Sequence, residues 1–174
     1  MRFAELKGGL RSSVADFLKQ NARLIDTNNF TELYKLAEAD HIDVRHMTKA
    51  FYAAEIDPLE YMRKVPENYL DGCRDCIGID IPEGIEVLGE SCFYDTNPIS
   101  ITVPESVRVI ESYALAGMDR LEELTILGEL ASVHAFAIWQ NPSLEIIYTL
   151  PANKDLIPKE YQGMIRYISK GLEF

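Results

Sequence analysis

Residues 79–104 read IDIPEGIEVLGESCFYDTNPISITVP, and the same short phrase stands at both ends of this stretch. The phrase starts at Ile79 and at Ile101, and it returns in altered form at Leu124 and Ile147, so the steps are 22, 23 and 23 residues. A fixed period of this length is typical of a solenoid, in which each repeat buries its apolar face only by stacking on a neighbour. We therefore predict four strands, at residues 79–82, 101–104, 124–127 and 147–150.

Other apolar positions keep the same period, and they form the sets Ile85, Val107, Leu130; Leu88, Ile110, Val133; and Cys92, Ala114, Ala137. With the phrase Ile-x-Ile/Val-Pro ahead of them, residues 79–99 and 101–121 resemble the BspA-like class of leucine-rich repeat. The third copy departs from this class because Leu127 replaces the proline. The resemblance covers roughly residues 77–151. It implies a β-solenoid that is used for binding and brings no catalytic residues.

The segments on either side of the repeats have a helical pattern. Apolar stripes within 14–25, 33–37, 44–54 and 59–62 predict four helices, the last introduced by Asp57 and Pro58. After Pro151, apolar residues at helical spacing predict a last helix: Ile157, Tyr161, Ile165 and Ile168. We predict an α+β chain with a helical capping subdomain at 1–70, a solenoid of about three coils at 71–151 and a C-terminal helical cap at 152–174.

The composition is that of a globular protein, with 47% hydrophobic and 26% charged residues. No run of 18 apolar residues predicts a membrane span, and the first residues lack the apolar core of a secretory signal. Three cysteines, an odd number, argue against a disulfide framework and favour a reducing compartment. We therefore expect a cytoplasmic protein.

The net charge of −11 is concentrated in the repeats, because residues 71–151 contain three Lys and Arg against fourteen Asp and Glu. Such a surface repels nucleic acid and attracts a basic partner. An equally open reading is that the acidic residues only keep the stacked strands soluble and their edges unpaired.

Few residues of the sequence suggest a catalytic or metal-binding site. Cys73-x-x-Cys76 has the spacing of a metal or redox site, but no second Cys or His pair follows, so we interpret it as two thiols in a turn. The histidines are scattered, and no nucleophile motif accompanies them. We expect no enzymatic activity, no cofactor and no metal.

Aromatic residues stand at repeat positions that a core does not require. Tyr94 shares a register with Trp139, Tyr113 shares one with Phe136, and Tyr148 takes an outward strand position. Exposed aromatic rings are common anchors of protein interfaces, although the rings could instead hold neighbouring coils together. The predicted protein-binding residues are Trp139, Tyr94, Tyr148, Tyr113 and Phe136, with the acidic Glu122, Glu123 and Glu105 around them.

These observations favour a non-catalytic protein-interaction module whose partner has a basic surface. The phrase Leu59-x-Tyr61-Met62 followed by Val65-Pro66 also resembles small repeat proteins encoded by bacteriophages, which implies an inhibitor of a host defence factor acting in the host cytoplasm. Two alternatives are an acidic nucleic-acid mimic that blocks a DNA- or RNA-binding enzyme and a bacterial adhesin-type repeat protein. An open solenoid end also leaves a homodimer as an alternative.

Overall fold

The structure of the protein is a computed structural model that describes residues 12–169. The chain divides into two compact units, of which the first ends at Met62 and the second begins at Arg63. The division between subdomains predicted at residue 70 therefore falls within the second unit.

The first unit is helical, as its apolar stripes predict. Its elements are α1 (Ser12–Gln20), α2 (Ala22–Asp26), α3 (Phe30–Ala39), α4 (Val44–Ala53) and the short 3-10 helix η2 (Pro58–Tyr61). The first predicted helix is thus two helices, which separate at Asn21. No helix in residues 12–169 has both the length and the apolar character that a bilayer span requires.

Side-chain caps explain where these helices begin. The backbone N–H of His46 donates to the carboxylate of Asp43 at 2.9 Å, and the N–H of Leu59 donates to Asp57 at 2.9 Å. Each cap gives a partner to an N–H group that the first helical turn leaves unpaired. Pro58 follows Asp57 at the first helical position, which needs no N–H donor.

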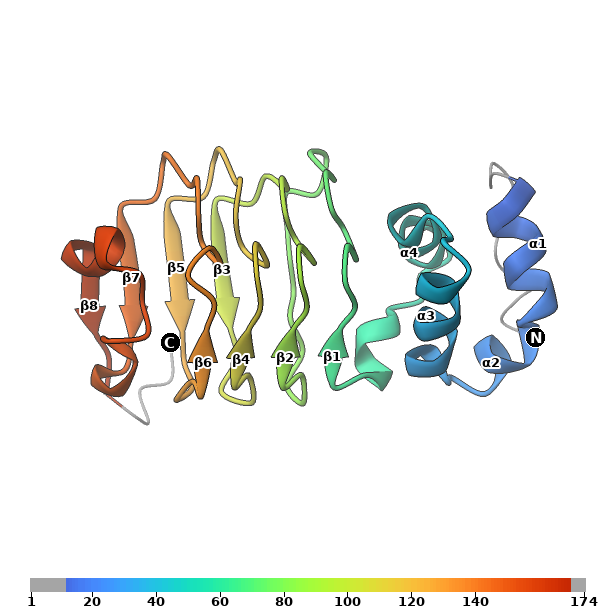
Figure 1. Cartoon of the computed structure of the whole chain (residues 1–174), viewed down its shortest axis with the longest axis horizontal. Helices are drawn as coiled ribbons and strands as arrows, with labels where there is room; N and C mark the ends of the chain where they lie inside the picture. The colour runs from blue at the N-terminus through green and yellow to red at the C-terminus, as the bar shows by residue number, and fades with distance from the viewer. Residues whose placement is uncertain (1–11, 170–174) are drawn as a thin grey trace. The chain divides into compact units, whose positions relative to one another are not determined.

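The second unit is a solenoid of two parallel sheets, seen as two rows of strands in Figure 1. One sheet has the order β1-β2-β4-β6 and the other β3-β5-β7-β8. The strands are β1 (Lys64–Val65), β2 (Val87–Leu88), β3 (Ser100–Val103), β4 (Val109–Ile110), β5 (Glu123–Ile126), β6 (Ser132–Val133), β7 (Ile146–Thr149) and β8 (Ile165–Tyr167). The α+β solenoid class predicted from the repeat is confirmed.

The predicted register between copies is also confirmed. Thr102 pairs with Thr125, and Thr125 pairs with Tyr148, in parallel strands. The neighbouring positions Ile101 and Leu124 are buried, because successive side chains of a strand point to opposite faces. The period of 22 to 23 residues therefore corresponds to one turn of the solenoid.

The start of the solenoid differs from the prediction. Residues 79–82 form no strand, whereas Lys64 and Val65 already pair with Val87 and Leu88. With four strands in each sheet, the solenoid is longer than the three coils predicted. The turn that follows residue 82 is linked to the next coil by a side chain, because the backbone N–H of Gly84 donates to the Ser106 hydroxyl at 3.0 Å.

The C-terminal segment also differs from the prediction. Its helical part consists of two short 3-10 helices, η3 (Pro151–Asn153) and η4 (Lys159–Met164). The helix expected to continue through Ile165 and Ile168 is replaced by β8. The free edge of β7 explains this outcome, because Ile147 pairs with Ile165 and the N–H of Ile168 donates to Thr149.

Buried asparagines and glycines hold successive coils together. The side chain of Asn153 accepts from the N–H of Leu130 at 2.9 Å and donates to the carbonyl of Gly128 at 2.8 Å. A Cβ on Gly128 would collide with the backbone carbonyl of Glu105, and one on Gly89 would collide with Val65. Both positions require glycine because the neighbouring backbone leaves no room for a Cβ atom.

Candidate functional site

Four aromatic side chains on successive turns form one group, which we call the aromatic cluster: Tyr94, Tyr113, Phe136 and Trp139. The ring of Tyr113 stacks on Phe136 with centroids 5.6 Å apart, and it meets Tyr94 edge-on at 6.2 Å and Trp139 at 6.1 Å. Phe136 and Trp139 are 6.2 Å apart. The structure therefore brings together four of the five aromatic residues that the repeat register singles out.

Backbone hydrogen bonds between the turns bring the rings together. The N–H of Asp95 donates to the carbonyl of Ala116 at 3.1 Å, and the N–H of Gly117 donates to Trp139 at 2.9 Å. These bonds confirm the predicted register of Tyr94 and Trp139, with Ala116 between them. The small Ala116 leaves space that the larger side chains of neighbouring turns can cover.

The cluster becomes more exposed toward the C-terminal coils. Tyr94 and Tyr113 are half-buried, whereas Phe136 is 46% and Trp139 is 40% exposed. His134 extends the group, because its ring lies 5.6 Å from Phe136 and its Nδ1 accepts the Phe136 N–H at 3.2 Å. Large rings exposed side by side are typical of protein interfaces.

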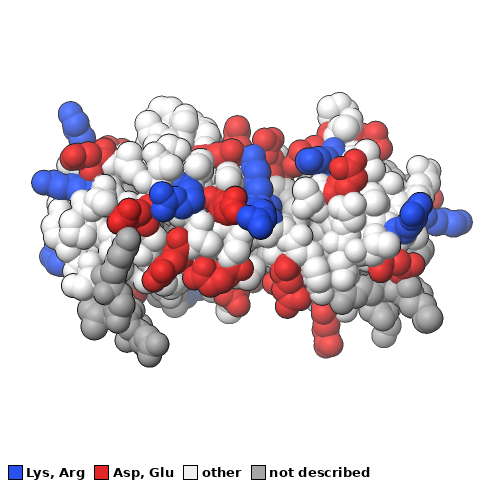
Figure 2. Space-filling view, turned by 90° about the horizontal axis from the view of Figure 1, so that it is seen from below, with Lys and Arg blue, Asp and Glu red and all other residues white. Residues whose placement is uncertain are grey.

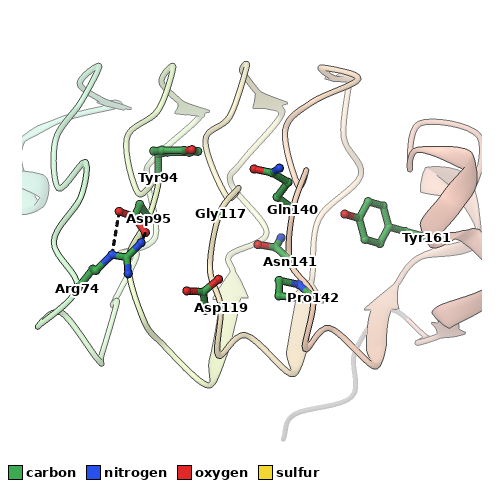
Figure 3. Close-up of a pocket in the computed structure, with 9 residues that line it drawn as sticks. All are labelled: Arg74, Tyr94, Asp95, Gly117, Asp119, Gln140, Asn141, Pro142 and Tyr161. Carbon is green, nitrogen blue, oxygen red and sulfur yellow. Dashed lines mark hydrogen bonds and ion pairs between the residues drawn. The ribbon is translucent and has the colours of Figure 1, made fainter.

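A groove of about 550 Å³ adjoins the cluster through Tyr94 (Figure 3). Its lining comes from the turns of several coils and from η4: Arg74, Tyr94, Asp95, Gly117, Asp119, Gln140, Asn141, Pro142 and Tyr161. The volume lies in the range typical of small-molecule or side-chain sites.

Charged groups occupy one end of the groove. The guanidinium of Arg74 binds the carboxylate of Asp95 with two contacts, Nε at 3.0 Å and Nη2 at 2.7 Å. The carboxylate of Asp119 makes no hydrogen bond or ion pair with any residue from 12 to 169, although its backbone carbonyl accepts the Ser143 hydroxyl at 2.6 Å. The pKa of Arg74 is raised by Asp95 first and by Asp119 to a lesser degree.

The rest of the lining is largely structural. The side chain of Asn141 accepts from Met118 N–H and donates to the carbonyls of Leu115 and Ile138, all within 2.9 Å. Burial raises the pKa of the Tyr161 phenol above its ordinary value. Arg74, Asp119 and Gln140 are exposed, so they remain available to a ligand.

The groove was not predicted from the sequence because its residues come from separate turns. One signal was present: Asp95, Gly117 and Gln140 occupy the same register, and they take the left-handed conformation with φ of 54°, 70° and 55°. In each coil, the left-handed residue at this shared position bends the backbone, and the neighbouring side chains lie along the groove.

The other predicted site residues lie elsewhere on the solenoid. Tyr148 is on β7, paired with Thr125, and it makes no ring contact with the cluster among the described residues. Glu105 is in the turn after β3, Glu122 directly precedes β5, and Glu123 is its first residue. None of these acidic residues lines the groove.

Several acidic side chains of the repeats are ion-paired. Arg63 pairs with Glu86, and Lys64 pairs with Glu111 at 2.9 Å. Figure 2 shows basic side chains lying among acidic ones on one face of the molecule. The charge of −11 is therefore not spread evenly over one uniformly acidic face.

The cysteines differ from the interpretation based on sequence. Cys73 and Cys76 form a disulfide rather than two free thiols, so the odd number of cysteines carries no conclusion about the compartment. Their sulfur atoms and a carboxylate oxygen of Asp75 lie within 4.8 Å of one another, a grouping that could hold a metal ion only in the reduced state. Cys92 is free and buried, as its repeat position predicts.

The comparisons with known proteins agree with the repeat. Residues 46–161 match the BspA type Leucine rich repeat region, in 6 copies. The match extends beyond residues 77–151 at both ends, and it takes in β1 of the first coil and the start of η4 after the last. The comparison with curated proteins finds no match. Since the match covers more than half of the 174 residues, the chain belongs to the BspA-type leucine-rich repeat family.

Proposed function

We propose that this protein is a non-catalytic binding module that holds a protein partner on its aromatic cluster. The repeat family suggests a protein-interaction module, and solenoids of this kind are typically scaffolds rather than enzymes. The observation that carries the proposal is the exposure of Phe136 and Trp139, 46% and 40%, next to each other in a set of stacked rings.

The cluster has an inner and an outer part with different roles. Tyr94 and Tyr113 are half-buried and connect neighbouring turns, so their rings stabilise the stack. Phe136 and Trp139 lie at the outer end and present apolar surface that no described residue covers. Burying such rings against a partner is favourable in proportion to the apolar area removed from water.

The charge of the repeats supports a partner with a basic surface. The ion pairs leave Glu105, Glu122 and Glu123 without a basic partner among the described residues. Negative charge on the surface of the solenoid accelerates the encounter with a basic protein and suppresses acidic competitors. The three glutamates thus steer association, while the rings supply most of the affinity.

The resemblance to bacteriophage repeat proteins adds a finer proposal, in which the partner is a host defence factor that binding disables in the host cytoplasm. It rests on the phrase from Leu59 to Pro66 alone, so it stays a prediction.

The test is a pull-down from bacterial lysate with the tagged full-length protein. We expect a specific basic partner that is lost with Trp139→Ala and is retained with Tyr167→Ala, a matched change at another exposed aromatic residue. Reversing the charges with Glu122→Lys and Glu123→Lys should slow association. A partner that is retained by the Trp139 variant would show that another face does the binding.

A further inference from the structure

The charged and aromatic side chains that line the groove beside Tyr94 indicate which kind of ligand it binds. We propose that this groove is the subsite for one basic side chain, arginine or lysine, of the protein partner. The inference rests on the proposed function, because the groove adjoins the aromatic cluster and would be covered by the same partner.

The side chains that line the groove carry a net negative charge. Its lining holds two carboxylates, Asp95 and Asp119, but only one basic side chain, Arg74. Arg74 is ion-paired with Asp95, whereas the exposed Asp119 forms no ion pair with a residue from 12 to 169. One negative charge is therefore left in a partly enclosed site, where a cation gains more than it would on an open surface.

Tyr94 forms an aromatic wall of the groove that is held in place by its neighbours. A Cβ on Gly117 would lie 3.0 Å from the ring of Tyr94, so this ring packs directly over the glycine backbone. Tyr113 supports the ring from another side, with centroids 6.2 Å apart. Figure 3 shows Tyr94 and Asp119 on the lining of the same groove, so one long basic side chain that lies along it can contact both the aromatic ring and the carboxylate.

The groove already binds a guanidinium from its own chain. Arg74 uses two donors toward Asp95, the geometry that arginine adopts with carboxylates, and its side chain is still 64% exposed. Asp119 offers the same carboxylate acceptor further along the groove. The side-chain amide of Gln140, which makes no hydrogen bond with a described residue, offers a further acceptor oxygen.

The test uses nuclear magnetic resonance on the full-length 15N-labelled protein with the peptide acetyl-Gly-Gly-Arg-Gly-Gly-amide. We expect saturable displacement of the Gly117 amide signal, which lies under Tyr94, and none at Gly84, which lies outside the groove. Asp119→Asn should weaken peptide binding by about tenfold. Asp80→Asn removes the same charge from an exposed site outside the groove and should change affinity by less than about twofold.

A peptide in which citrulline replaces arginine keeps the shape of the side chain but has no charge, and it should produce no saturable displacement. The proposal is overturned if the citrulline peptide binds equally, if both aspartate variants weaken binding equally, or if the arginine peptide never saturates the Gly117 signal. These outcomes are distinct from failure of the proposed function, which the Trp139→Ala pull-down tests without reference to the groove.

Discussion

The rings of Tyr113 and Phe136 lie almost parallel, 12° between planes and 5.6 Å between centroids, although they belong to different coils of the solenoid. Tyr113 also takes a left-handed backbone conformation, with φ of 56°. A bulky residue rarely adopts this conformation, and the ring contacts of Tyr113 help to offset the backbone cost. The stack is therefore part of what holds the turns in register.

The first prediction separates structural rings from binding rings. Tyr113→Ala removes three ring contacts and should lower the free energy of unfolding by about 2 kcal/mol. Trp139→Ala, at an exposed position, should lower it by less than about 1 kcal/mol. Urea unfolding of the two variants measures both losses of unfolding free energy. Equal losses would mean that Trp139 mainly holds the stack together.

A second prediction concerns the spacing between coils. Gly128→Ala places a Cβ against the backbone carbonyl of Glu105, which cannot move without separating the coils. We expect a loss of about 2–3 kcal/mol in unfolding free energy. Gly163→Ala is the matched control, since its Cβ would meet nothing within 4 Å. A Gly128 variant as stable as the Gly163 variant would show that the coils are not closely packed there.

The buried amide of Asn153 gives a third prediction. Asn153→Ala leaves the N–H of Leu130 and the carbonyl of Gly128 without their partner in a buried site. Each unpaired buried group is costly, and we expect a total loss of about 3 kcal/mol on thermal or urea unfolding. Ser143→Ala removes one exposed hydrogen bond and should cost less than about 1 kcal/mol. Similar losses for the two variants would argue against the buried network.

A fourth prediction is the pH dependence that Cys92 contributes. Burial raises the pKa of its thiol above the model-compound value of 9.0, so the folded state holds the proton more tightly than the unfolded state. Its contribution to stability is complete below pH 9 and is lost as the pH rises further, by up to about 1.4 kcal/mol per pH unit. The wild type should lose more stability than Cys92→Ala between pH 9 and pH 10.5. Parallel losses would mean that the thiol ionises as easily in the folded protein.

The repeat is the part of the fold that the sequence predicts best. Positions such as Ile101 and Leu124 recur at one step and are buried, so both period and register follow from apolar spacing. The first coil was missed because Lys64 and Val65 precede the first Ile-x-Ile-Pro phrase, at Ile79, from which the predicted repeat was counted. The last strand was missed because Ile165 keeps helical spacing with Tyr161, while the open edge of β7 favours a strand.

The candidate site was predicted in part for a similar reason. Shared register revealed Tyr94, Tyr113, Phe136 and Trp139, because residues in one register lie side by side on adjacent coils. The groove depends instead on contacts between unlike residues, such as Arg74 with Asp95, which no period encodes.

The affinity of the captured partner for Trp139→Ala tests the central claim most directly. Isothermal titration with the wild type, Trp139→Ala and Tyr167→Ala would compare a ring of the cluster with an exposed ring on β8. The binding module proposed here predicts a loss of about 2 kcal/mol or more, about thirtyfold in Kd, for Trp139→Ala alone. Unchanged affinity of the Trp139 variant, with its fold intact, would contradict the claim that the partner binds on the aromatic cluster.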